Sequence, residues 1–328
     1  MAKVSFIVIG YNISVYLERC FNTILNQTLK DIEVIFVNDG STDDTKEVIN
    51  KIADKDNRVR VINQKNSGAN AARKRGFIDA TGEYVLFVDG DDWIELDTAE
   101  KLYNIVDKEK YDIVSFGHYF TFDDHKEKAE IKVSGILKDY DYLDNVIISK
   151  LSHNIWNKFF NRDFLINANF NSIPNLTMGD DLAANVRLGV CKPKTLIIDE
   201  YYYNYYHRSD SVTRQISPKI LEIQSTIKDI QNCLKEKNLF ERYSGQVDYI
   251  KFHEFFIGVV KCRHKDSYIQ RKLYSDWKSE KIRIKKNKFC VDYLNSRPFL
   301  ERLLLYFYLI NYNIGYFVSR VYLKIRDK

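Results

Sequence analysis

Along the first quarter of the chain, short β-branched or aromatic runs alternate with stretches that carry apolar residues at helical spacing. The runs that predict buried strands are 4–9, 33–37, 59–62 and 84–88. The stretches that predict helices are 15–26, 43–55 and 69–80. A strict alternation of strand and helix is typical of α/β proteins with a Rossmann-like, mostly parallel sheet flanked by helices. We therefore predict this architecture for the N-terminal part of the chain.

The pattern changes two thirds of the way along the sequence. Helix and strand signals are mixed over residues 95–199, whereas beyond Pro218 the apolar residues recur at three- and four-residue spacing. Charge divides at a similar place: residues 1–214 carry 27 Lys and Arg against 33 Asp and Glu, and residues 215–328 carry 23 against 12. We predict an α/β domain at 1–214, followed by a mainly helical, basic and aromatic region at 215–328.

The composition indicates a globular protein with a substantial core. The 328 residues are 45% hydrophobic and include only 4 Pro and 13 Gly, which excludes disordered and collagen-like chains. The five cysteines are widely spaced and form no Cys-x-x-Cys pair. No apolar run is long enough for a signal peptide or a membrane span, so we expect a reduced, cytoplasmic protein.

Polar and aromatic residues follow the predicted strands at the point where each strand ends. Tyr11 and Asn12 follow the first strand, Asp39 follows the second, and the segment Asp-Gly-Asp-Asp at 89–92 follows the fourth. Ligands of parallel sheets bind at the carboxyl ends of the strands, so we expect these residues to converge on one site. Clustered carboxylates suit Mn²⁺ or Mg²⁺, although a solvated acidic turn would give the same pattern. Neither GxGxxG nor GxxxxGK is present, so we expect bound phosphates to be held through the metal.

Several segments, taken together and in order, resemble the family 2 glycosyltransferases of the GT-A fold. The N-terminal segments that carry the resemblance are 4–12, 37–43, 66–68 with Ala72 and Arg73, and 89–92. The later segments 156–158, 179–181 and 203–213 resemble acceptor-side motifs of bacterial members. The resemblance therefore extends to about residue 214, and the remainder of the chain resembles no family that we would rely on.

The resemblance implies roles for residues on the donor side. Tyr11 would stack on the nucleotide base, Asp39 would hydrogen-bond to the base, and Asn12 and Arg73 would lie near the nucleotide. For Tyr11, ordinary packing is the alternative. Gly10 departs from the family, in which Pro is common at this position.

The resemblance also implies which residues would hold a divalent metal and the donor phosphates. Asp91 would be the direct ligand of the metal, and Asp89 would contact the ribose or a metal-bound water. His207 would complete the set of ligands beside Arg208, in a segment that closes over the donor phosphates. A lone histidine more often satisfies a local hydrogen bond, and this alternative stays open for His207.

On the acceptor side, the resemblance implies that Asp181 is the general base. Asp180 stands where Glu is usual in the family and would contact the acceptor. Trp156 and Lys158 would line the acceptor pocket. The residues themselves leave two alternatives open. Two acids at the start of a helix also complement the helix dipole, and Trp156 is equally plausible in the core.

These roles predict an inverting, metal-dependent glycosyltransferase that moves a sugar from a nucleotide-diphosphate donor, a UDP-sugar by expectation, to a hydroxyl of a glycan or lipid-linked acceptor. The resemblance implies bacterial surface-polysaccharide synthesis, such as capsule or exopolysaccharide assembly. A Gln-x-x-Arg-Trp segment is absent, which disfavours a processive synthase. The alternatives are an inactive glycosyltransferase-like scaffold or partner subunit and a sugar nucleotidyltransferase.

The C-terminal region carries a separate signal. The segment 281–288 is rich in Lys and Arg, an aromatic tract follows at 303–322, and Lys324, Arg326 and Lys328 end the chain. Basic residues beside an amphipathic aromatic segment suit an anionic membrane surface, which would place the protein peripherally at the inner face of the membrane, near a lipid-linked acceptor. The alternative is a solvated face with a helix that packs on the domain or on another subunit of a homo-oligomer. Nucleic-acid binding is not expected, because no recognition motif is present.

Overall fold

The computed structural model describes residues 2–173, 176, 178–208, 218–262 and 267–326. The chain divides into two compact units. The first comprises Met1–Asn175 with Asp180–Ser211, and the second comprises Leu176–Gly179 with Val212–Lys328. The predicted boundary between residues 214 and 215 lies outside the described residues.

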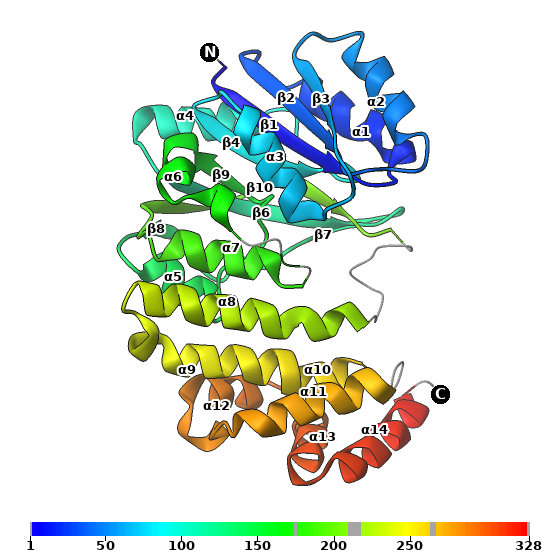
Figure 1. The fold of residues 1–328 in the computed structure, drawn as a ribbon, viewed down its shortest axis with the longest axis vertical. Helices are drawn as coiled ribbons and strands as arrows, with labels where there is room; N and C mark the ends of the chain where they lie inside the picture. Colours follow the sequence, from blue (N-terminus) through cyan, green and yellow to red (C-terminus); the bar gives the residue numbers. More distant parts are fainter. Residues whose placement is uncertain (1, 174–175, 177, 209–217, 263–266, 327–328) are drawn as a thin grey trace. The chain divides into compact units, whose positions relative to one another are not determined.

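A ten-stranded sheet forms the centre of the first unit, with the order β3-β2-β1-β4-β9-β6-β10-β5, β7 beside β6 and β8 beside β10 (Figure 1). The strands are β1 Val4–Gly10, β2 Ile32–Asn38, β3 Val59–Asn63, β4 Tyr84–Asp89, β5 Trp93–Ile94, β6 Ile113–Thr121, β7 Lys126–Lys128, β8 Gly135–Leu137, β9 Lys158–Asn161 and β10 Thr195–Tyr206. The four long pairings, β1 with β2, β1 with β4, β2 with β3 and β6 with β10, are parallel, and the short ones are antiparallel. The predicted α/β architecture is therefore confirmed.

Helices cover both faces of this sheet. They are α1 Ser14–Leu25, α2 Thr45–Ala53, α3 Ala69–Asp79, α4 Thr98–Lys108, α5 Asp141–Val146, α6 Arg162–Asn167, the 3₁₀ turn η1 Phe170–Ser172, and α7 Asp180–Gly189. Phe6 and Phe36 point to the face where α1, α2 and α4 bury their apolar side chains. Ile7 and Val37 point to the opposite face, where Gly76 lets α3 approach them closely. Because β1 and β2 are buried on both faces, they appear in the sequence as continuous apolar runs.

The second unit is helical, as predicted. Its elements are η3 Pro218–Glu222, α8 Ile223–Glu236, α9 Phe240–Lys251, the π-helical turn η4 Phe252–Ile257, α10 Gly258–Lys261, α11 Ser267–Glu280, η5 Ile284–Lys286, α12 Lys288–Asn295, α13 Phe299–Ile310 and α14 Tyr312–Arg326. Its core is aromatic: Phe252 and Phe256 stack with ring centroids 5.5 Å apart, and Trp277 packs on both.

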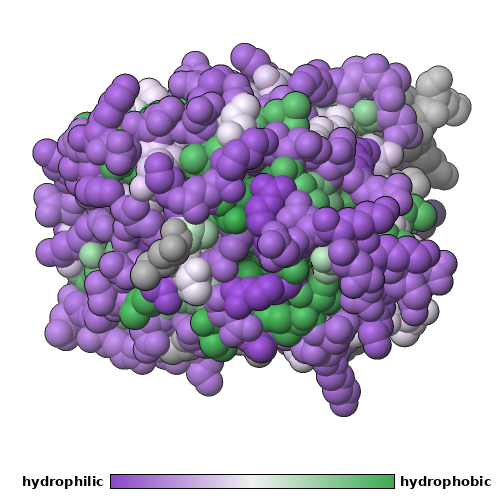
Figure 2. Space-filling view, turned by 90° about the horizontal axis from the view of Figure 1, so that it is seen from above, coloured by the Kyte–Doolittle hydropathy of each residue, from purple (hydrophilic) through white to green (hydrophobic). Residues whose placement is uncertain are grey.

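The apolar residues of the chain are mostly interior. The face of the molecule in Figure 2 is largely hydrophilic, with hydrophobic residues gathered in a band near its middle. Among the described helices, none combines the length and apolar character that crossing a bilayer requires.

Candidate active site

The register of the sheet brings the predicted strand-end residues to one edge. Gly10, at the end of β1, pairs with Asn38 at the end of β2. On its other side β1 pairs with β4, where Ile9 lies opposite Asp89. The loops that follow these three strands therefore start side by side, as parallel strands require. They carry the candidate residues Tyr11, Asn12, Asp39, Asp89 and Asp91.

Two glycines at this edge make room for a single side chain, that of Ile13. A Cβ atom added at Gly10 would lie 2.3 Å from Ile13 Cδ1, and one added at Gly90 would lie 2.5 Å from the same atom. The Ile13 side chain is buried. The glycine at position 10, where the family commonly has Pro, therefore fits the packing of the first loop, and Gly90 has a structural reason to lie within the acidic segment.

Asn12 ties the loop after β1 to the loop after β2. Its backbone N–H donates to Ser41 Oγ at 3.0 Å, and its Oδ1 accepts from the Thr42 N–H at 2.8 Å. Its φ angle of +53° lies in the left-handed region, which asparagine tolerates better than most residues. Tyr11, beside it, is 45% exposed, so its ring is available for stacking on a ligand.

Asp39 is buried and organises the loop after β3. Its Oδ1 accepts from Gln64 Nε2 at 2.7 Å and from the Ser67 N–H at 2.9 Å, and its Oδ2 accepts from the Gly68 N–H at 2.9 Å. A carboxylate has about four lone-pair positions, so these three bonds leave about one for a ligand. The sequence predicted contact with a nucleotide base, but did not reveal that Asp39 holds the loop around it.

The acidic segment after β4 divides into an accessible part and a buried part. Asp92 is fully buried, and its carboxylate accepts from Tyr203 Oη at 2.7 Å and from the Tyr206 N–H at 2.8 Å. Tyr203 Oη also accepts from the Asp89 N–H at 3.1 Å. Burial, then the charges of Asp91 and Asp89, raises the pKa of Asp92 well above its usual range. Asp92 thus fixes the shape of the segment, while the side chains of Asp89 and Asp91 stay partly exposed.

One buried guanidinium, that of Arg73 on α3, joins the two sides of the site. Its Nη2 lies 2.9 Å from Asp89 Oδ1, and its Nη1 lies 3.1 Å from Asp181 Oδ1. Burial alone would lower the pKa of Arg73, but the carboxylates of Asp89 and Asp181 raise it above its usual range. Its Nε is buried without a hydrogen-bond partner among the described residues.

Two further arginines reach Asp91. Arg208 Nε lies 3.4 Å from Asp91 Oδ2, which places the predicted donor-side arginine at the acidic segment. Arg19 Nη2 donates to the Asp91 carbonyl oxygen at 2.9 Å, with its guanidinium 3.8 Å from the centroid of Trp93 and 4.2 Å from that of Tyr206. The sequence did not indicate Arg19, because nothing distinguishes it from any polar residue on an amphipathic helix.

Asp181 lies in the first turn of α7, where its side chain is partly buried. Burial raises its pKa to about 6, with Arg73 opposing the rise and Asp180 and Asp89 adding to it. Its Oδ2 accepts from the Ile155 N–H at 3.4 Å. Burial also raises the pKa of Asp180, which is partly exposed like Asp181. Because Asp181 is partly buried and paired with Arg73, it does more than complement the helix dipole.

Trp156 and Lys158, predicted to line an acceptor pocket, lie in the interior. The Trp156 ring stacks on Tyr203 with centroids 4.2 Å apart and meets His118 edge-on. Lys158 is fully buried, and its Nζ donates to the carbonyl oxygens of Ser152 and Asn154 at 2.8 Å and 2.5 Å. Burial lowers the pKa of Lys158 to about 7. These contacts favour the core interpretation for Trp156 and place Lys158 as the anchor of the 152–157 segment.

His207 packs among aromatic rings. It stacks on Phe122 with centroids 4.6 Å apart and meets Phe120 and Tyr205 edge-on. Within the described ranges, no three His, Cys, Asp or Glu side chains are grouped so that they could hold a metal ion. Mg²⁺ and similar ions often take only one or two carboxylates from the protein and fill their other positions with phosphate oxygens and water. Asp89 and Asp91 therefore fit such an ion without His207.

Comparisons with known proteins agree with this site. Residues 5–169 match the family model described as "Glycosyl transferase family 2". Glycosyltransferase GlyA of Streptococcus pneumoniae serotype 4 is 32% identical over 223 residues, which span 65% of this chain but only 32% of GlyA. The uncharacterized glycosyltransferase EpsJ of Bacillus subtilis is 30% identical over 270 residues, or 80% of this chain and 75% of EpsJ.

Solved structures show the same fold. S. aureus TarS in complex with UDP superposes with a TM-score of 0.64 at 22% identity, covering 84% of this chain and 80% of that one. TarS in complex with UDP-GlcNAc superposes with a TM-score of 0.56 at 20% identity, covering 86% and 93%. The family-model match covers more than half of the chain and confirms the predicted resemblance, so the protein belongs to glycosyl transferase family 2.

Proposed function

We propose that this protein is an inverting, metal-dependent glycosyltransferase that moves a sugar from a UDP-sugar to a hydroxyl of a glycan or lipid-linked acceptor in bacterial surface-polysaccharide synthesis. The observation that carries the proposal is the Arg73 bridge. It joins Asp89, at the end of a central strand, to Asp181, at the start of α7. TarS, which has a similar fold, has been captured with UDP and with UDP-GlcNAc, and this supports a uridine nucleotide as the donor.

On the donor side, Tyr11 offers an exposed ring for the base. Asn12 and Asp39 hold the loops around that position through the hydrogen bonds described above. The guanidinium groups of Arg73 and Arg208, at Asp89 and Asp91, would supply positive charge near the diphosphate. The donor would therefore lie along the edge of the sheet with its phosphates at the acidic segment.

Asp91 and Asp89 would hold Mn²⁺ or Mg²⁺, which when bound would neutralise the charge that develops on the leaving diphosphate. Burial and the neighbouring Asp89 raise the pKa of the Asp91 carboxyl, and a bound cation would favour its ionised form. Arg19 and Arg208 keep Asp91 in place from two sides. We keep His207 out of this set because of its aromatic packing.

On the acceptor side, Asp181 would take the proton of the acceptor hydroxyl. The hydroxyl oxygen then forms a bond to the anomeric carbon while the bond to the donor phosphate oxygen breaks, and the electron pair leaves with the diphosphate. One displacement of this kind inverts the anomeric centre. A carboxylate whose pKa is raised toward neutral pH is a stronger base than an ordinary one, which suits this role. Asp180 would contact the acceptor.

The test is Mn²⁺-dependent release of nucleoside diphosphate from a panel of UDP-, GDP- and dTDP-sugars, with and without a lipid-linked acceptor. Release from one donor should disappear in Asp91→Asn and persist in Asp54→Asn, a matched change at an exposed aspartate on α2's C-terminal side. If no donor binds or reacts, the inactive-scaffold alternative replaces the proposal. If the protein instead makes a nucleotide sugar from a sugar phosphate and a nucleoside triphosphate, the nucleotidyltransferase alternative replaces the proposal.

A further inference from the structure

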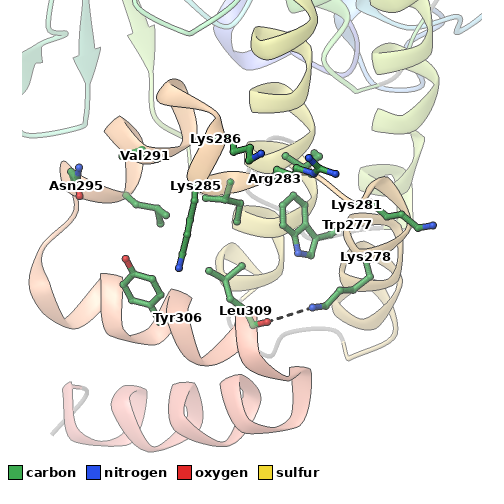
Figure 3. Close-up of a pocket in the computed structure, with 13 residues that line it drawn as sticks. Trp277, Lys278, Lys281, Arg283, Lys285, Lys286, Val291, Asn295, Tyr306 and Leu309 are labelled. Carbon is green, nitrogen blue, oxygen red and sulfur yellow. Dashed lines mark hydrogen bonds between the residues drawn. The ribbon is translucent and has the colours of Figure 1, made fainter.

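A cavity of about 750 Å³ lies within the second unit, between α11, η5, α12 and α13 (Figure 3). Its lining includes five basic side chains and no acidic one; the basic residues are Lys278, Lys281, Arg283, Lys285 and Lys286. Its apolar wall is formed mainly by Trp277, Val291, Leu294, Tyr306 and Leu309. A cavity of this size accommodates a small organic ligand. The lining suits an anion with apolar groups attached.

The basic side chains of this cavity are exposed, although Lys281, Arg283 and Lys286 also line an adjoining cavity that contains Asp248 and Glu280. In the part of the chain that the structure describes, Lys281, Arg283, Lys285 and Lys286 form no ion pair, and all four are exposed. Lys278 donates to the Leu309 carbonyl oxygen at 3.4 Å. In Figure 3 the Lys285 side chain extends toward α13, from which Tyr306 projects. Several exposed cations that face one cavity without forming ion pairs favour an anionic occupant.

Exposed apolar side chains are also concentrated on α13, which lines this cavity, and on α14, which packs against α13. On α13, Phe299, Leu303, Tyr306 and Ile310 recur at helical spacing and so lie along one stripe of the helix. The exposed apolar residues of α14 are Ile314, Phe317 and Val321. Of the fifteen large apolar residues that are exposed in the described ranges, eight lie between positions 299 and 321. Single exposed apolar residues are ordinary, but a concentration of this kind marks an interaction surface.

We propose that α13 and α14 rest on a membrane surface that contains anionic phospholipid, and that the basic cavity receives a phosphate head group. Tyr306 belongs to both features, since it lines the cavity and is half exposed on the apolar stripe. An amphipathic helix with apolar residues beside Lys and Arg binds in the interfacial region through both apolar burial and charge. This membrane contact is separate from the proposed reaction, and its test needs neither a sugar donor nor an acceptor.

A second copy of this chain fits the same surface less well. In a twofold-symmetric dimer the same patch meets itself, so the basic cavities would face one another. Residues 215–328 carry 23 Lys and Arg against 12 Asp and Glu, which makes such a contact repulsive. An anionic bilayer supplies the opposite charge and an apolar layer together.

The test is flotation of the full-length protein with vesicles of phosphatidylcholine alone or with one third phosphatidylglycerol. We expect binding to the anionic vesicles only. Replacing Lys281, Arg283, Lys285 and Lys286 by Gln should reduce vesicle binding by at least about tenfold. The matched control replaces four exposed lysines of the first unit by Gln, namely Lys46, Lys51, Lys55 and Lys108, and should retain binding although its net charge is the same. Raising the salt, which shortens the Debye length from about 10 Å at 0.1 M to about 3 Å at 1 M, should release the protein.

A second variant tests the role of the exposed apolar side chains of α13 and α14 in vesicle binding. Phe299, Ile310 and Phe317 are 68%, 68% and 69% exposed, so replacing them by Ser should leave the fold intact, as a thermal melt would verify, while abolishing flotation. Equal loss in both four-residue Gln variants would mean that only net charge matters and would overturn the assignment of the cavity. A wild-type dimer that these Ser changes dissociate, together with no vesicle binding, would assign the face to a second copy instead.

Discussion

Arg73 holds Asp89 and Asp181 on either side of a single guanidinium, although Asp181 lies 108 residues further along the chain. The arginine is buried, so each of its ion pairs is weakly screened by solvent. The acid at the end of β4 and the acid at the start of α7 are therefore fixed relative to one another before any substrate binds. In the proposed reaction these are the donor-side and acceptor-side acids.

The first prediction concerns this bridge. Arg73→Gln removes the positive charge that lowers the pKa of Asp181, so that pKa should rise and the acid limb of the pH–rate profile should move to higher pH. The unpaired acids should also destabilise the fold by about 3–5 kcal/mol, as when one partner of a buried ion pair is removed. Arg73→Lys keeps the charge, but its single ammonium group cannot bond to both acids as the guanidinium does. Its stability and the position of its acid limb should therefore lie between those of the wild type and Arg73→Gln. An unchanged acid limb in Arg73→Gln would argue against Asp181 as the base.

The second prediction separates the two acids of α7. Asp181→Asn should lower kcat by about 10²–10⁴, the usual contribution of a general base, while UDP binding measured by calorimetry persists. Asp180→Asn should act mainly on the KM of the acceptor, because the ion pair with Arg73 is formed by Asp181 and not by Asp180. If Asp180→Asn abolished kcat and Asp181→Asn spared it, the two roles would have to be exchanged.

The third prediction is a pH dependence of opposite sign for activity and stability. In the proposed reaction Asp181 is the base, and a carboxylate accepts a proton only when ionised, so the rate should fall about tenfold per pH unit below its pKa of about 6. Folding raises this pKa from the usual 3.8, so the native state binds the proton more tightly, and the contribution of Asp181 to stability is lost as pH rises through about 6. Urea unfolding of the wild type and of Asp181→Asn at pH 4.5 and 7.5 measures this contribution to stability. The stability of the wild type relative to the variant should be greater at the lower pH.

Local sequence patterns predicted the strands and their ends well. The runs at 4–9 and 84–88 correspond closely to β1 and β4, because strands that are buried on both faces are continuously apolar. Parallel pairing then places Asp39 and Asp89 at one edge, which follows from topology alone. The sequence could not predict contacts between distant elements, such as the bonds from Asp39 to the 64–68 loop.

Side-chain orientation accounts for the other differences between the predicted site and the structure. Trp156 and Lys158 were predicted on the acceptor side, but neither is exposed, because β9 starts in the interior of the sheet between β4 and β6. Arg19 reaches Asp91 across 72 residues of sequence from an ordinary helical position. Such contacts depend on the way helices pack on the sheet, which periodicity does not encode.

The fourth prediction tests Tyr203 as a positioning residue for the acidic segment. Tyr203→Phe removes the hydroxyl that donates to Asp92 and accepts from the Asp89 N–H. A buried carboxylate loses a donor, so the free energy of unfolding should fall by about 1–3 kcal/mol. The Mn²⁺ concentration for half-maximal UDP release should rise while the acid limb set by Asp181 stays in place. Tyr268→Phe, at an exposed tyrosine of α11, is the control. A purely structural role would lower stability without changing the Mn²⁺ dependence.

The fifth prediction concerns the packing of Ile13 against Gly90. The Cβ of Gly90→Ala would lie 2.5 Å from Ile13 Cδ1 and 3.0 Å from the Ile9 carbonyl oxygen, so the variant should lose about 1–3 kcal/mol through overpacking. Ile13→Val removes Cδ1 and alone should cost about 0.5–1.5 kcal/mol. Combined, the two changes should cost less than the sum of their separate effects, because the deleted methyl group makes room for the added one. Urea unfolding of the four proteins completes the double-mutant cycle. Strict additivity would show that the backbone oxygen of Ile9, and not the Ile13 side chain, is what requires glycine at this point of the acidic segment.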